Sequence, residues 1–208
     1  MNERTKARIS FFIYIGLLIV FDTSYSFMIL NLFLAFAALE LSFLLRLFHV
    51  QNKREIPMSV LFFIVFLLLS PNAIYVVTDL IHLNVFAFDF KEGLQLNEWW
   101  NFTILVSGVI LAIYYYVNMI KQVYFYSNDI TSAKWLFFVF ILLSSIGVFI
   151  GRFLRFHSIH LFTEPVTLIV RFIEAIDFSA VLFISWMSIL QFLICWLFLD
   201  GTGEAHDK

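Results

Sequence analysis

Two short stretches of the chain carry most of the polar side chains that could do chemistry. Residues 71–83 read PNAIYVVTDLIHL, and residues 151–158 read GRFLRFHS. A carboxylate beside a histidine can exchange protons, and arginine guanidinium groups bind phosphate well. We therefore select as candidate site residues Asn72, Tyr75, Asp79, His82, Arg152 and Arg155.

The first stretch places its polar residues on one side of a predicted helix. At about 100° per residue, four side chains fall on a single stripe and should face the same neighbour: Asn72, Tyr75, Asp79 and His82. Pro71 has no N–H group to give to the helix, so a kink is expected there.

A metal site is the alternative use of these side chains. Asp79 with His82, or His157, His160 and Glu164, could supply carboxylate and imidazole ligands. The proline after Glu164 disfavours helix there, so the second set loses its regular spacing. Nucleotide, dinucleotide and hydrolase motifs are missing from the sequence, so we expect no cofactor and leave catalysis open.

The composition defines where these residues must lie. The 208 residues are 62% hydrophobic and 13% charged, against about 45–50% and about 25% in soluble domains. This excludes a soluble monomer, and the high hydrophobicity excludes disorder. We predict an all-α, polytopic membrane helix bundle that forms one integral membrane domain over residues 1–208.

Apolar runs of usable length predict about six transmembrane helices, because a helix needs about 20 apolar residues to cross a bilayer. The expected spans are residues 9–21, 25–48, 57–77, 99–121, 135–150 and 178–199. The first is short and could instead be an interfacial helix. Residues 79–98 and 152–177 are too apolar for free loops, so we expect two interfacial outer segments or short amphipathic helices folded against the bundle.

Lysine and arginine positions predict the orientation, because these residues are enriched in cytoplasmic loops. With both termini cytoplasmic, nine of the 13 Lys and Arg residues lie inside. The other four lie outside: Lys91, Arg152, Arg155 and Arg171. Arginines on the outer side run against this bias and need partners, so we predict that Asp79 pairs with Arg152 or Arg155.

Other charged residues have simpler expected roles. Glu40 lies in the second apolar run, and structural pairing is a better explanation for it than transport. Lys53, Arg54 and the basic residues near the N-terminus are expected to contact anionic lipid headgroups.

The two polar stretches resemble those of a family of small bacterial multi-pass membrane proteins catalogued as domain of unknown function 1361. The resemblance covers most of the chain and includes Pro71, Asn72, Tyr75, Thr78, Asp79, His82, Gly151, Arg152, Arg155 and Ser158. The chain departs from the family pattern at Phe156, His157 and His160, where Trp, Asn and Asp are expected. The resemblance implies a bacterial cytoplasmic membrane and gives no activity.

Three functions remain open at this point. The first is an outward-facing polar site that binds an anionic headgroup or lipid-linked phosphate. The second is a small transporter or permease with a path beside Pro71 and Asn72. The third is an accessory or assembly protein whose polar residues only stabilise the bundle. The expected partners are the lipid bilayer and an anionic lipid, not nucleic acid.

Overall fold

The structure is a computed structural model, and it describes residues 1–21, 23–85, 93–129, 134–154 and 165–199. All regular secondary structure in these ranges is helical, as the composition predicts. The α-helices are α1 Glu3–Val20, α2 Phe27–Ser42, α3 Ile56–Leu69, α4 Pro71–Tyr75, α5 Leu96–Asp129, α6 Lys134–Phe149, α8 Pro165–Ala175 and α9 Phe178–Leu199. Two 3₁₀-helices, η1 Lys53–Glu55 and η2 Val76–Val85, and one π-helix, η3 Ile150–Leu154, complete the described elements.

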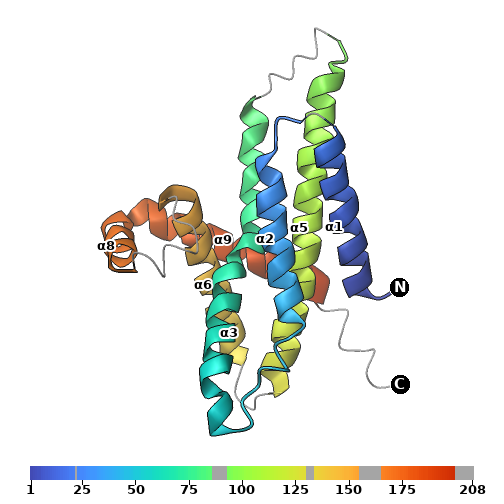
Figure 1. The fold of residues 1–208 in the computed structure, drawn as a ribbon. Helices are drawn as coiled ribbons and strands as arrows, with labels where there is room; N and C mark the ends of the chain where they lie inside the picture. Colours follow the sequence, from blue (N-terminus) through green and yellow to red (C-terminus); the bar gives the residue numbers. More distant parts are fainter. Residues whose placement is uncertain (22, 86–92, 130–133, 155–164, 200–208) are drawn as a thin grey trace.

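The bundle is built around α2. This helix, α1, α5 and the column formed by α3, α4 and η2 run side by side along the long axis of the molecule (Figure 1). Helix α2 packs against α1, α4 and α5, and its buried face carries fully buried Met28, Leu32, Ala35 and Leu39. Because α2 contacts α4 and η2, it is an element against which the first polar stretch is positioned.

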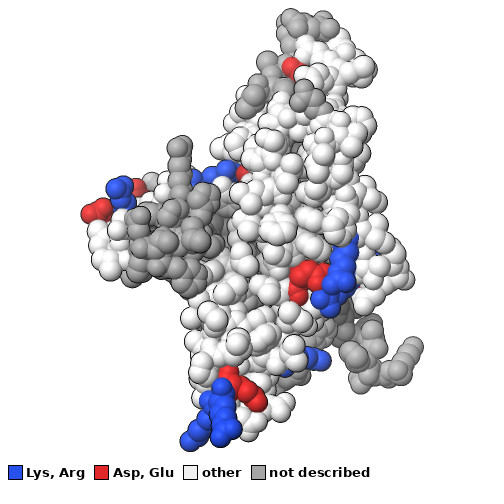
Figure 2. All heavy atoms as spheres, viewed as in Figure 1, with Lys and Arg blue, Asp and Glu red and all other residues white. Residues whose placement is uncertain are grey.

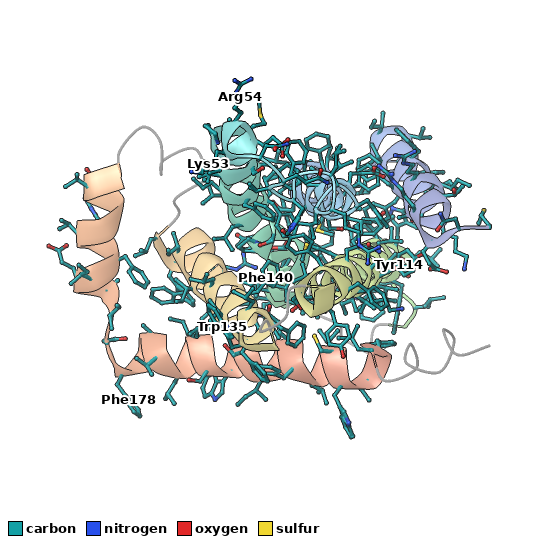
Figure 3. The ribbon with its side chains drawn as sticks, turned by 90° about the horizontal axis from the view of Figure 1, so that it is seen from below. Lys53, Arg54, Tyr114, Trp135, Phe140 and Phe178 are labelled. Carbon is teal, nitrogen blue, oxygen red and sulfur yellow. The ribbon has the colours of Figure 1, made fainter. Side chains whose placement is uncertain are left out.

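Helix α9 lies across this bundle. Figure 3 shows the other long helices nearly end-on and α9 lengthwise along one side, with Phe178 at its start pointing away. Its inner face packs on α6 and α5. The Gln191 side chain accepts a hydrogen bond from the Tyr116 hydroxyl at 2.8 Å and donates one to the Ser145 Oγ at 2.7 Å. A fully buried amide therefore ties α9 to both helices.

Replacing Gln191 with leucine should cost about 1–2 kcal/mol of folding free energy, because the buried Tyr116 hydroxyl loses its acceptor within an apolar surrounding. Thermal unfolding in detergent would measure the loss. Ser185→Ala is the matched control on the same helix, since the exposed Ser185 hydroxyl bonds only the Val181 carbonyl within the described part of the chain. Equal effects of the two variants would contradict the prediction.

Four helices in the described ranges are long and apolar enough to cross a membrane: Lys53–Asn84, Leu96–Ser127, Trp135–Leu154 and Phe178–Leu199. They correspond to the third to sixth predicted spans. Helix α2 is apolar but has 16 residues, about 24 Å, which is shorter than a hydrocarbon core of roughly 30 Å. The structure confirms a helical membrane bundle, and the count of six crossings stays a prediction.

Several helices begin or end more than a turn away from the predicted spans, whose membrane boundaries stay predictions. The first helix begins at Glu3, before residue 9, because Asn2 caps it through the Arg4 N–H group. The second ends at Ser42, six residues early. The start of the predicted first outer segment is helical, because η2 continues the column of α3 and α4 to Val85. The prediction ended the third span before the charged residue Asp79, whereas Asn31 and Arg152 compensate this charge inside the bundle.

The predicted break at Pro71 is present and its freed carbonyl groups are satisfied. Helix α3 ends at Leu69 and α4 begins at Pro71. The Ser70 hydroxyl donates to the Leu67 carbonyl at 3.0 Å, and the Asn72 amide donates to the Leu69 carbonyl at 2.9 Å. Side-chain donors of this kind make proline breaks tolerable in apolar surroundings.

On the face shown in Figure 2, charged side chains gather in separate patches, among them one over α1 and one where α3 begins. In the patch on α1, Arg4 Nη2 and Arg8 Nε donate to the Glu40 carboxylate at 2.6 and 2.7 Å. Glu40 is thus structurally paired, as expected. Arg4 and Arg8, for which we expect contacts with lipid headgroups, also hold α1 against α2.

Candidate functional site: a buried ion pair between two helix columns

Asp79 is the centre of the candidate site. It lies on η2, and its side chain is 1% exposed. Its Oδ1 atom accepts a hydrogen bond from Arg152 Nη2 at 2.9 Å, and its Oδ2 atom accepts one from Asn31 Nδ2 at 2.8 Å. The carboxylate therefore joins three elements, α2, η2 and η3. Because both oxygens have charged or amide donors, its burial is compensated.

Arg152 is held by three acceptors on the opposite column. In addition to Asp79, its Nε donates to the Thr78 Oγ1 at 3.1 Å and its Nη1 to the Tyr75 hydroxyl at 3.4 Å. The Thr78 hydroxyl itself donates to the Tyr75 carbonyl at 2.6 Å, which leaves its lone pairs for Arg152. The guanidinium carbon lies 4.8 Å from the centre of the Tyr75 ring. These contacts fix the plane of the guanidinium group.

Two glycines allow the columns to approach each other closely. A Cβ atom at Gly147 would lie 2.5 Å from Pro71 Cγ, and one at Gly151 would lie 3.4 Å from Tyr75 Cε2. The two glycines are four residues apart, and so are Pro71 and Tyr75. Gly147 therefore lies against Pro71, and Gly151 lies against Tyr75. Small residues at this spacing bring helix backbones together in membranes. The close contact of these glycines with Pro71 and Tyr75 places Arg152 beside Thr78 and Asp79.

The helices depart from α geometry where the ion pair forms. Residues from Val76 onward turn by about 120° each, because η2 is a 3₁₀-helix with three residues per turn. Asp79 and His82 are three apart and stay on one face. Arg152 lies in the wider π-helix η3. Segments of 3₁₀-helix inside a longer helix often mark functional hinges, and short π-helical segments are frequent at functional sites.

The predicted stripe of four residues is therefore only partly correct. Tyr75 and Asp79 share the same neighbour, Arg152. Asn72 bonds its own helix, and the His82 ring lies against the ring of Phe27, with centroids 4.7 Å apart. The stripe assumed α geometry throughout, whereas the chain breaks at Pro71 and tightens after Tyr75. The predicted pairing of Asp79 with Arg152 is confirmed.

Four predicted residues, Arg155, His157, His160 and Glu164, lie outside the described residues. Within the ranges that the structure describes, no group of three His, Cys, Asp or Glu side chains is placed to hold a metal ion. Asp79 and His82 are not arranged as a ligand pair, since both oxygens of Asp79 accept hydrogen bonds from protein donors.

Sequence reasoning missed Asn31 as a member of this site. It lies on α2, 48 residues before Asp79. The signal that could have identified it is a polar amide in an otherwise apolar run, because polar groups inside membrane helices seek partners across helices. Thr78 was noted only as part of the motif, and its hydroxyl proves to be an acceptor for Arg152.

Fold and site together define an all-α membrane protein in which a buried ion pair links two helix columns. A family model described as "Protein of unknown function (DUF1361)" matches residues 30–194, and the chain belongs to this family. The matched range contains Asn31, Tyr75, Thr78, Asp79 and Arg152. Comparisons with curated proteins and with solved structures give no significant match.

Proposed function

We propose that this protein is an integral membrane protein of the bacterial cytoplasmic membrane that binds an anionic headgroup, or a lipid-linked phosphate, at Arg152 on the outer side. The distribution of Lys and Arg supports cytoplasmic termini and an outward-facing site. The observation that carries the proposal is the unequal exposure of the ion pair. The Arg152 side chain is 19% exposed and that of Asp79 is 1% exposed, so the cation is the member within reach of a ligand.

The hydrogen bonding of Arg152 supports the same assignment. A guanidinium group has five N–H donors, and three hydrogen bonds join Arg152 to Thr78, Tyr75 and Asp79. Two N–H groups, one on each Nη atom, have no acceptor among the described residues. A fixed guanidinium group with spare donors binds phosphate oxygens without first losing side-chain freedom.

The alternatives are less well supported. A transporter needs backbone carbonyl groups or polar side chains that line a path, whereas the carbonyl groups freed at Pro71 are already bonded by Ser70 and Asn72. An accessory protein with a purely structural ion pair makes the opposite prediction for ligand binding. We assign no reaction to the site.

Titration of the full chain in phosphatidylcholine nanodiscs with short-chain phosphatidylglycerol, read by native mass spectrometry, tests the proposal. The double variant Asp79→Asn, Arg152→Gln replaces the ion pair by two neutral amides of similar shape. We expect its affinity to fall at least about tenfold, because charged hydrogen bonds to the headgroup are lost.

Arg171→Gln on α8 is the matched control, because it removes one exposed positive charge outside the ion pair. It should leave the affinity within about twofold of the unmodified chain. Equal affinity of the double variant and the unmodified protein would contradict the proposal and favour a structural role for the ion pair.

A further inference from the structure

Among the described residues, the charges of the ion pair at the candidate site sum to zero. Arg152 contributes one positive charge and Asp79 one negative charge, with Asp79 Oδ1 2.9 Å from Arg152 Nη2. The other groups that contact the guanidinium group, the hydroxyls of Thr78 and Tyr75, are neutral. Within the described part of the chain, a ligand on Arg152 therefore meets a cation that is already compensated.

This compensation limits how much negative charge the site can accept. An anion beside Arg152 is attracted by the guanidinium group and repelled by the carboxylate next to it. Both interactions are stronger in the partly buried site than in water. A ligand with one negative charge leaves the cluster with a single excess charge. A ligand with two negative charges loses more hydration on entering the partly buried site. Asp79 cancels part of the attraction by Arg152 that would offset this loss, and no additional cation is supplied there by the described residues.

The geometry of the donors suits the same class of ligand. The two N–H groups without acceptors lie on different Nη atoms, so they can reach two oxygen atoms of one group. The Tyr75 ring covers one face of the guanidinium group, with its centre 4.8 Å from Cζ. A ligand must therefore approach from the remaining directions. A phosphodiester presents two non-bridging oxygens and one negative charge.

We propose that the site selects the phosphodiester monoanion of a lipid headgroup over a phosphomonoester dianion, and that Asp79 sets this selectivity. The inference rests on the proposed binding of headgroups at Arg152. Asp79 acts here by repulsion, which lowers the affinity for both ligands and lowers that for the dianion more, because each ligand charge is repelled.

Competition between two short-chain lipids tests the inference. Phosphatidylglycerol supplies a diester, and phosphatidate supplies a monoester that carries close to two charges at about pH 8. With the full chain in phosphatidylcholine nanodiscs, we expect phosphatidylglycerol to bind at least about tenfold more tightly than phosphatidate. Asp79→Asn should abolish or reverse this preference, and phosphatidate should then raise the unfolding temperature of that variant.

Glu174→Gln is the control, since it removes an exposed acid on α8 outside the site and should keep the wild-type preference. If phosphatidate bound the unmodified chain as tightly as phosphatidylglycerol does, this result alone would overturn the inference. An unchanged preference in Asp79→Asn would also overturn it.

A soluble diester, dimethyl phosphate, separates the two sources of the ligand. Binding as tight as that of phosphatidylglycerol would overturn the assignment to a lipid headgroup. The failure of the proposed function itself looks different. In that case both lipids bind equally to the unmodified chain and to the double variant that lacks Arg152.

Discussion

Replacing Asp79 with alanine is expected to lower the free energy of unfolding by about 3–5 kcal/mol. The variant leaves Arg152, whose side chain is 19% exposed, without its counter-charge and the Asn31 amide without its acceptor. Removing one member of a buried ion pair costs more than the pair contributes, because the remaining charge stays in an apolar environment. Equilibrium unfolding in mixed micelles, followed by tryptophan fluorescence, would measure the loss.

The variant with both charges removed separates this effect from simple loss of packing. Asp79→Asn together with Arg152→Gln should be more stable than Arg152→Gln alone, since no uncompensated charge remains. Glu174→Ala, an exposed acid on α8, should change stability by no more than about 0.5 kcal/mol. A cost below about 1 kcal/mol for Asp79→Ala would show that the pair behaves as a surface ion pair.

Gly147→Leu is expected to cost about 3 kcal/mol, at the upper end of the range for added volume in a packed interior. The new Cβ atom would lie 2.5 Å from Pro71 Cγ and 2.8 Å from Pro71 Cβ. The proline ring is rigid, so α6 must move away from α4. Because Arg152 follows five residues later, the variant should also weaken the coupling between Arg152 and Asp79 in a double-mutant cycle.

Gly16→Leu on α1 is the matched control for this substitution. A Cβ atom at Gly16 meets nothing within 4 Å, and leucine favours helix over glycine by nearly 1 kcal/mol. We expect this variant to be neutral or slightly stabilised in the same unfolding measurement. Similar losses at the two glycines would contradict the role given to the contact between α6 and α4.

The membrane helices were predictable because a bilayer imposes length and composition on any segment that crosses it. The last predicted span, 178–199, coincides with α9. Helix and predicted span differ most clearly where a charge was used to end the span. Asp79 ended the third predicted span, although the helix column continues to Val85 because Arg152 and Asn31 compensate the carboxylate.

The candidate site was predictable in part for a related reason. Asp79 and Arg152 are charged residues in apolar surroundings, so each needs a partner, and few partners are available. The local helix geometry that decides which of these side chains face Arg152 could not be predicted from the sequence. Tyr75 and Asp79 face Arg152, whereas Asn72 turns to the Leu69 carbonyl freed by the break at Pro71. That outcome depends on which backbone groups the break leaves unbonded.

The sequence by itself determined that this is a helical membrane protein and that Asp79 and Arg152 need partners, because hydropathy and uncompensated charge are properties of the residues themselves. Tertiary structure alone decided which groups meet. Asn31 joins Asp79 across 48 positions of the chain, and Gly147 and Gly151 allow the close approach that brings Arg152 to Thr78. These contacts follow from how helix surfaces pack, and a partner on another helix leaves no periodic signal in the chain.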